Sequence, residues 1–83
     1  MKIHKTIEIN KKKDINCICL TKDNKYIITG SDDKLVRIWN LKDGKCIREL
    51  EYHKHYVLSI CVTNDGKYII SGGSLGYIAI WNF

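Results

Sequence analysis

The sequence contains one unit twice, and this duplication constrains the fold more than any other feature. Residues 15–41 align without a gap with residues 57–83, at an offset of 42, and 12 of the 27 aligned positions are identical. Unrelated segments of this length would share about one or two identities. We therefore expect two copies of one supersecondary structure, each burying its apolar faces against a neighbouring unit.

Short runs of Ile, Val, Tyr and Trp alternate in each unit with Asp, Asn and Gly, which predicts strands joined by hairpin turns. The expected strands cover residues 16–20, 26–29, 35–39 and 46–50 in the first unit, and 58–62, 68–71 and 77–81 in the second. The fold class is therefore all-β, and each unit is expected to be a four-stranded antiparallel meander. Segment 77–81 reads Tyr-Ile-Ala-Ile-Trp, apolar throughout, so each sheet should be covered on both faces.

Landmarks at fixed spacing within these units resemble those of the WD-repeat β-propeller family. In the second unit the landmarks are His53 to Val57, Thr63–Gly66, Ile70–Gly73 and Ile80–Asn82; in the first they are Thr21–Asn24, Ile28–Asp33 and Val36–Asn40. The resemblance extends from about Ile9 to the C-terminus and implies that both units are propeller blades. Asn40 and Asn82 replace the Asp of the signature dipeptide, and Tyr52 stands where the family has Gly before His.

Members of this family often contain a buried hydrogen-bond network of His, Ser or Thr, Asp and Trp. The resemblance assigns this structural network to Thr29, Asp33 and Trp39 in the first unit, and to His53, Ser71 and Trp81 in the second. Lys11 occupies the His position of the first unit, and Leu75 the Asp position of the second. Both networks are expected to be incomplete, which would lower the stability and rigidity of the blades.

The chain is expected to divide into a basic segment (1–14), a first repeat (15–56) and a second repeat (57–83) that lacks a fourth strand. Residues 6–9 are a candidate strand, and because an N-terminal strand typically closes the ring in this family, the resemblance implies a closing role for them. Two blades are fewer than the roughly four to eight of a propeller. Two explanations stay open: copies of the chain assemble into a homo-oligomeric ring, or the sequence is a fragment of a larger propeller.

In this family, partners commonly bind the loops that precede the first strand of a blade or join its second and third strands. The resemblance places the candidate partner-binding residues there: Lys12, Lys13, Asp32, Lys54, His55, Tyr56 and Ser74. Tyr56 is the favoured anchor because an exposed aromatic side chain beside basic residues is typical of binding hot spots. The alternative is that Tyr56 only covers its own blade. The expected function is a protein-interaction scaffold with other proteins as partners.

The lysine-rich start of the chain leaves a second function open. The net charge is +5, and the first 14 residues contain five lysines against Glu8 and Asp14, so the remaining residues carry only +2. RNA association within a ribonucleoprotein assembly, through Lys11, Lys12 and Lys13, is the alternative function. Nucleic acid is the less favoured partner, because a short lysine run is more often a solvated loop.

No pattern of catalytic or ligand-binding residues is found in the sequence. The cysteines at 17, 19, 46 and 61 are spread over both units without a C-x-x-C pair, so no metal site is expected. Segment 71–76 is glycine-rich, but a strand rather than a helix should follow it, which favours a hairpin turn over a phosphate loop. No nucleophile stands at a spacing that would let a base activate it. We expect no enzymatic activity and no cofactor.

Membrane insertion and secretion are not expected either. The sequence has no run of about twenty apolar residues and no signal-peptide pattern. We expect a cytoplasmic protein, with the nucleus as the alternative location, in which the cysteines stay reduced.

Overall fold

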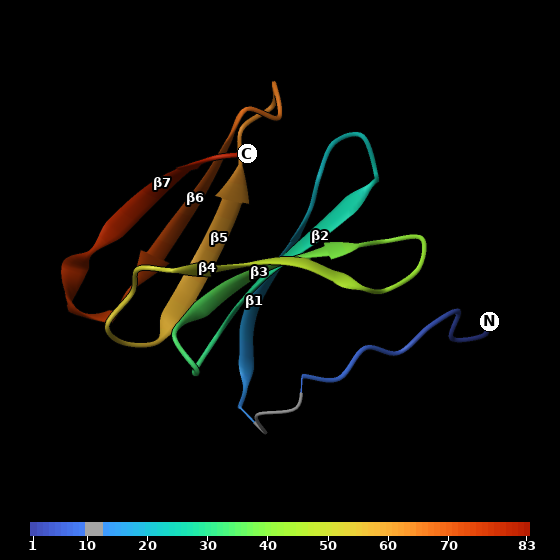
Figure 1. Ribbon diagram of the computed structural model, residues 1–83, viewed down its shortest axis with the longest axis horizontal. Helices are drawn as coiled ribbons and strands as arrows, with labels where there is room; N and C mark the ends of the chain where they lie inside the picture. The colour runs from blue at the N-terminus through green and yellow to red at the C-terminus, as the bar shows by residue number, and fades with distance from the viewer. Residues whose placement is uncertain (10–12) are drawn as a thin grey trace.

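The computed structural model describes residues 1–9 and 13–83, which form two antiparallel sheets (Figure 1). The first sheet contains, in spatial order, β1 (Ile15–Leu20), β2 (Tyr26–Ser31), β3 (Leu35–Asn40) and β4 (Cys46–Glu51). The second contains β5 (Val57–Val62), β6 (Tyr68–Gly73) and β7 (Ile78–Asn82), with a 3₁₀ turn at Ser74–Gly76. The predicted all-β fold and hairpin order are confirmed, and every predicted strand end lies within two residues of the observed one.

Strands β2 and β6 both continue two residues beyond their predicted ends. A bulge lies between Ile15 and Cys17 in β1, and another between Val57 and Ser59 in β5. A bulge inserts one residue into a ladder and shifts the pairing beyond it. Ile15 consequently pairs with the residue at 31, and Val57 with the residue at 73, so segments whose composition predicts a turn still belong to strands.

The turn between the first two strands has the same hydrogen bonds in both sheets. Thr21 Oγ1 donates to Asp23 Oδ1 at 2.7 Å, and Thr63 Oγ1 donates to Asp65 Oδ1 at 2.7 Å. The residue after each aspartate has a left-handed backbone, with φ 64° at position 24 and 74° at position 66. Asn and Gly, which occupy these positions, are the residues that tolerate this conformation best.

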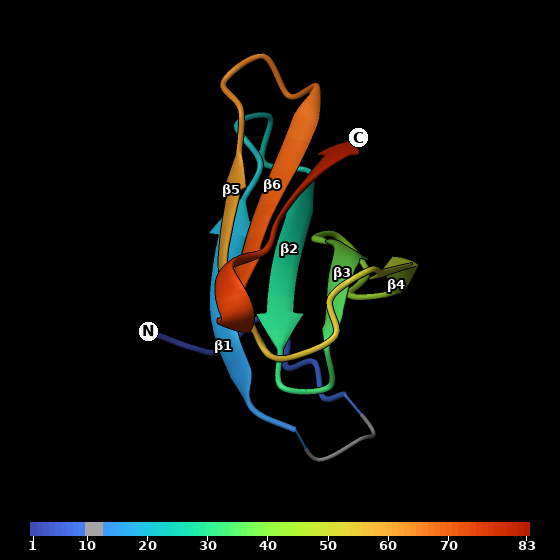
Figure 2. The ribbon, with the colours of Figure 1, turned by 90° about the vertical axis from the view of Figure 1, so that its left-hand side faces the viewer.

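The two sheets meet along β5, which lies beside β1 and β2 (Figure 2). Ile28, Val36 and Ile38 of the first sheet form one buried cluster with Val57 and Ile69 of the second. Ile38 is 4% exposed and the other four side chains are completely buried. The hydrophobic core therefore lies between the sheets, so each sheet depends on the other for its burial.

Gly30 in β2 lies directly against Val57 of the second sheet. A Cβ atom at this position would lie 2.5 Å from Cγ1 of Val57 and 2.7 Å from Sγ of Cys17. Both neighbours are held in strands and cannot move away easily. Any side chain at position 30 would therefore push the sheets apart.

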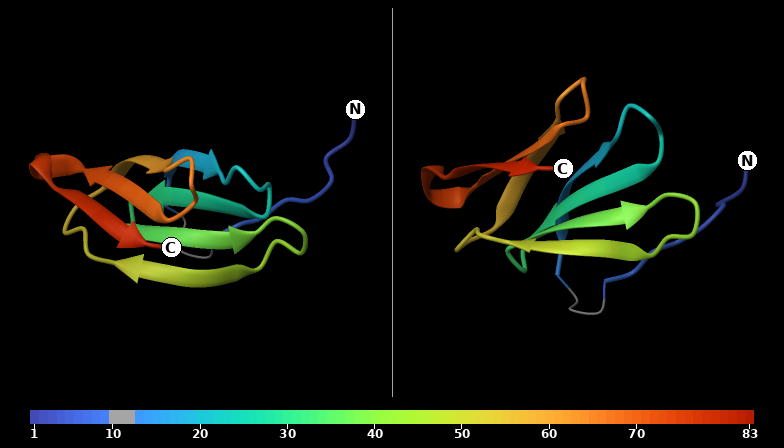
Figure 3. Two further views of the ribbon diagram at one scale, coloured as in Figure 1. Left: turned by 90° about the horizontal axis from the view of Figure 1, so that it is seen from above. Right: turned by 45° about the horizontal axis from the view of Figure 1, so that its top comes forward.

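Strands β3 and β7, the third strands of their sheets, are covered unequally. In β3 five of six residues are buried, whereas Ile78 and Ile80 of β7 are 69% and 68% exposed. No described strand pairs with the outer edge of β7. Residues 1–9 form no strand and run past the side of the first sheet that faces away from the second (Figure 3). The predicted strand at 6–9 therefore does not form within a single chain, and its closing role stays a prediction.

The substitution Val57→Ala should lower the free energy of unfolding by about 2 kcal/mol, because it removes two buried methyl groups where the sheets meet. Urea denaturation followed by tryptophan fluorescence measures this loss. Leu58→Ala is the matched control: Leu58 is 51% exposed, so its truncation should cost less than about 0.5 kcal/mol. Equal losses for both variants would contradict a core shared between the sheets.

Candidate interaction face

Four connecting segments lie at the same end of the two sheets. Ile15 at the start of β1 pairs with Ser31 at the end of β2, and Val57 at the start of β5 pairs with Gly73 at the end of β6. The β2–β3 and β6–β7 turns therefore lie beside the segments that lead into β1 and β5. These four segments are termed the docking edge: residues 13–16, 32–34, 52–56 and 74–77.

Six of the seven predicted partner-binding residues lie on the docking edge: Lys13, Asp32, Lys54, His55, Tyr56 and Ser74. The side chains at 32 and 74 are half-buried, and the other four are exposed. Lys12 lies outside the described residues. The structure thus brings residues from distant parts of the sequence to one end of the fold, while partner binding by them stays a prediction.

Hydrogen bonds within each sheet and one between the sheets hold the backbone of the docking edge. Nδ2 of Asn16 donates to Oδ1 of Asp32 at 2.7 Å and to the backbone oxygen of Val57 at 3.0 Å. The Ser74 amide donates to the backbone oxygen of Tyr56 at 3.1 Å. Because the bond from Asn16 to Val57 joins the two sheets, the docking edge is one continuous surface.

Tyr56 provides the exposed aromatic surface of the docking edge. Its side chain is 45% exposed, and its ring centroid lies 4.7 Å from that of His55. The backbone beneath it is crowded, since a Cβ atom on Gly73 would lie 2.9 Å from both the Tyr56 oxygen and Nδ1 of His53. The ring therefore stands on a fixed backbone with nearly half of its surface accessible to a partner.

The predicted network of the second unit forms behind this edge. Nε1 of Trp81 donates to Oγ of Ser71 at 2.9 Å, and Nε2 of His53 lies 2.7 Å from the same hydroxyl. Burial lowers the pKa of His53. Leu75, at the position of the family's Asp, is 74% exposed in the β6–β7 turn. The network thus contains the three expected residues and anchors the loop before β5 to β6 and β7.

The residues expected to form one network in the first unit make two separate sets of hydrogen bonds. Nε1 of Trp39 donates to Oγ1 of Thr29 at 3.0 Å, as the resemblance implies. Asp33 instead pairs with the guanidinium group of Arg37 and accepts a hydrogen bond from Ser31. Burial alone would raise the pKa of Asp33, but these hydrogen bonds hold this pKa below its ordinary value.

Arg37 is the residue of this site that sequence reasoning missed. It is 3% exposed, and its Nε donates to Glu49 at 2.9 Å while its other nitrogens contact Asp33 and Ser31. No buried side-chain nitrogen or oxygen of the described residues lacks a hydrogen-bond partner. Both networks still lack one position of the family pattern, and the lower stability and rigidity expected of the blades stay a prediction. A charged residue inside an apolar strand, four positions after an aspartate, was the available signal.

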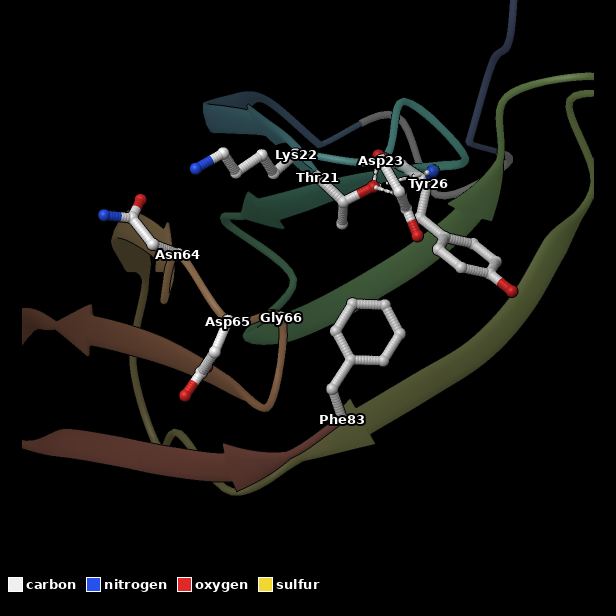
Figure 4. Close-up of a pocket in the computed structure, with 8 residues that line it drawn as sticks. All are labelled: Thr21, Lys22, Asp23, Tyr26, Asn64, Asp65, Gly66 and Phe83. Carbon is white, nitrogen blue, oxygen red and sulfur yellow. Dashed lines mark hydrogen bonds between the residues drawn. The ribbon is translucent and has the colours of Figure 1, made fainter.

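A groove of about 510 Å³ lies at the opposite end of the sheets, between the turns that follow β1 and β5 (Figure 4). The rings of Tyr26 and Phe83 line it, with their centroids 5.4 Å apart. Hydrogen bonds within the turns lower the pKa of both aspartates of the groove, chiefly from the Thr21 hydroxyl to Asp23 and from the backbone amide of residue 67 to Asp65. These carboxylates hold the turns together, and we assign the groove no ligand.

Several other expectations concern absences or residues outside the described range. All four cysteines are free thiols. Residues 1–9 and 13–83 contain no cluster of three potential metal ligands, and no helix among them could cross a membrane. Segment 71–76 ends β6 and forms a turn into β7, which confirms the hairpin over the phosphate loop. Lys11 and Lys12 lie outside the described residues and Lys13 is exposed, so RNA association remains an untested prediction.

The lowered pKa of His53 makes stability depend on pH in a defined direction. The unfolded chain, with an ordinary histidine pKa of 6.5, binds a proton more readily than the folded chain. The stabilising contribution is therefore complete above pH 6.5 and is lost as pH falls toward the lower, folded-state pKa. Urea denaturation across this range should show a smaller pH effect in His53→Gln than in wild type. A pH effect in His53→Gln as large as that in wild type would contradict the assignment.

Comparison with known proteins agrees with this geometry. The family described as WD domain, G-beta repeat matches residues 2–40 and residues 44–82. A WD repeat-containing protein of Schizosaccharomyces pombe is 35% identical over 48 residues, which are 58% of this chain and 16% of that relative. The general transcriptional corepressor TUP1 of Saccharomyces cerevisiae is 33% identical over 45 residues, which are 54% of this chain and 6% of TUP1.

Two solved structures show the same arrangement of strands. U3-55K superposes with a TM-score of 0.83 and the RRP9 WD40 repeats with a TM-score of 0.84, each at 25% identity and over 89% of this chain. The match covers 24% of each of those chains, so this chain spans under a quarter of their length. WD40 repeat proteins are generally non-enzymatic scaffolds for protein interaction. With the family matched over both units and the propeller fold shared, this chain belongs to the WD40 repeat family and its two sheets are propeller blades.

Proposed function

We propose that this chain is a protein-interaction scaffold that binds other proteins at its docking edge, with Tyr56 as the central contact. The observation that carries the proposal is an aromatic side chain, 45% exposed, on a backbone held by hydrogen bonds from both sheets. A partner that binds such a surface has little loop entropy to remove, and a tyrosine ring adds contact area at low entropic cost.

The residues around Tyr56 indicate the chemistry of the partner. Lys54 and His55 are exposed beside it, whereas the carboxylate of Asp32 is already engaged by the amide of Asn16. A partner segment with an apolar residue next to an acidic one fits this arrangement, because the ring would contact the former and Lys54 the latter. In this proposal the chain catalyses no reaction and requires no cofactor.

The scaffold is further proposed to act within a complete propeller in the cytoplasm or the nucleus. Support for completion comes from the family match, whose two ranges start 42 residues apart and thereby align residues 2–9 with 44–51. The latter range contains β4, the fourth strand of the first sheet. The N-terminal segment therefore has the sequence character of a fourth strand, in agreement with the predicted closing role of residues 6–9.

Affinity capture from cell extract, followed by titration of each purified partner, tests the docking edge. Tyr56→Ala should weaken partner binding by about 2 kcal/mol, roughly thirty-fold in Kd, as expected for a central aromatic contact. Tyr68→Ala is the matched control, because Tyr68 is a tyrosine with a similar exposure of 41%, at the opposite end of its sheet. It should leave the Kd unchanged.

Two results would contradict the proposal. Partners retained equally by Tyr56→Ala and wild type would show that the docking edge is not the contact surface. Binding abolished by ribonuclease, steeply weakened by salt and lost when Lys11, Lys12 and Lys13 are replaced by Ala would instead favour the RNA alternative.

A further inference from the structure

The two sheets pack through unlike faces, which are termed the back face of the first sheet and the front face of the second. Ile28, Val36 and Ile38 lie on this back face, and Val57 and Ile69 lie on this front face. The repeat offset of 42 gives each face an equivalent on the other sheet. The second sheet has its own back face, with Ile70, Ile78 and Ile80, and the first sheet its own front face, with Ile15, Ile18, Ile27 and Trp39.

The equivalent faces keep their apolar character but lie open. On the back faces, Val36 and Ile38 are 0% and 4% exposed, whereas their equivalents Ile78 and Ile80 are 69% and 68% exposed. On the front face of the first sheet, Ile15 and Ile18 are 46% and 67% exposed, whereas Trp39 is 7% exposed. Each end of this two-blade unit therefore exposes the repeat equivalent of an apolar face that is buried between the two blades.

The room needed for close contact is also present on the open back face. Gly72 is the repeat equivalent of Gly30, the glycine over which Val57 packs. A Cβ atom at Gly72 would meet only Oγ of Ser59 within 4 Å. The space that Val57 fills above Gly30 is thus unfilled above Gly72, and the repeat equivalent of Val57 is Ile15 on the open front face.

The N-terminal segment covers the open front face incompletely. Ile7 and Ile9 lie over Ile18, Ile27 and the nearby tryptophan, but a half-open pocket of about 250 Å³ remains at this contact. Lys5 Nζ donates to the backbone oxygen of residue 43 at 3.1 Å, and this exposed bond is weak. The segment therefore leaves apolar surface of this face in contact with solvent, and a better-fitting apolar face would bury more of it and could displace the segment.

The repeat offset supplies a second position for the displaced segment. In the first sheet, β4 pairs with β3 so that Glu49 lies opposite Arg37. Shifted by 42 residues, the same register places Ile7 opposite Ala79 on the unpaired edge of β7. An N-terminal segment that leaves its own front face can therefore become the fourth strand of a second sheet, satisfying the open backbone groups of β7.

The geometry points to a head-to-tail assembly of identical chains, in which the back face of the second sheet of one copy packs on the front face of the first sheet of the next. The N-terminal segment of that next copy adds to the edge of β7. An interface between unlike faces closes into a ring when its rotation permits. A propeller of roughly four to eight blades then needs two to four copies. This inference goes beyond the scaffold proposal and requires no partner at the docking edge.

Light scattering of the full chain, from low to high micromolar concentration, tests the assembly. We expect a mass of two to four times the 9.6 kDa of one chain, constant with concentration. A well-folded species of 9.6 kDa at every concentration would overturn the inference, and a mass that keeps growing would overturn the closed ring.

Two pairs of variants assign the interface to its residues. Ile80→Lys places a charge on the open back face and should reduce the mass to 9.6 kDa, whereas Leu75→Lys, on an exposed turn, should not. Ile7→Pro should also release single chains because proline cannot donate to the β7 ladder. Ile3→Pro should leave the mass unchanged, because residue 3 aligns with Lys45, outside β4.

Circular dichroism distinguishes loss of assembly from loss of folding. If Ile80→Lys unfolds, the mass of Ile7→Pro tests the assembly instead. Residues 1–9 form no strand in a single chain, so proline at position 7 should not unfold it. An unchanged mass in Ile7→Pro would overturn the added strand, and an unchanged mass in folded Ile80→Lys would overturn the packed face. Folded single chains that still bind a partner through Tyr56 would contradict the assembly and leave the scaffold proposal intact.

Discussion

The burial of one sheet against the other, centred on Val57 above Gly30, is the contact on which the rest of the structure depends. Each meander contributes an apolar face, and the two faces form one cluster in which four of five side chains are inaccessible to water. A repeat that cannot bury its own face gains stability only from its neighbours. The same requirement explains why the two-blade unit leaves an apolar face open at each end.

The polar contacts hold the connecting segments in place, whereas the apolar core holds the two sheets together. Asn16 connects a loop of the first sheet to the backbone of the second, and Ser71 joins His53 to Trp81 behind the loop before β5. These bonds lie at or behind the docking edge, where connecting segments would otherwise move. A WD40 blade pair can thus separate its two kinds of contact: apolar faces bind neighbouring blades, and a hydrogen-bonded edge presents side chains such as Tyr56 to partners.

The repeat made the strands and hairpin order predictable, because each strand has its apolar run and each turn its Asp, Asn or Gly in both copies. The extra length of β2 and β6 was not predictable from composition, since it results from bulges in the strands they pair with. The ion pair of Asp33 with Arg37 was missed for a related reason. The resemblance assigned Asp33 to a network with Trp39, but the strand register places Arg37 closer, with Glu49 opposite it. The local sequence pattern determines where strands and turns form, whereas the side chains that meet across neighbouring strands depend on how those strands are aligned.

The central claim is that the open faces at the two ends of this chain fit each other as the two sheets do within it. Isotope-filtered NMR of a mixture of labelled and unlabelled chains tests it most directly, because it detects only contacts between different copies. The account predicts contacts between the methyl groups of Ile80 in one copy and Ile18 in another, the repeat equivalents of Ile38 and Ile60 in the shared core. Contacts of Ile18 only with Ile7 and Ile9 of its own chain would contradict it.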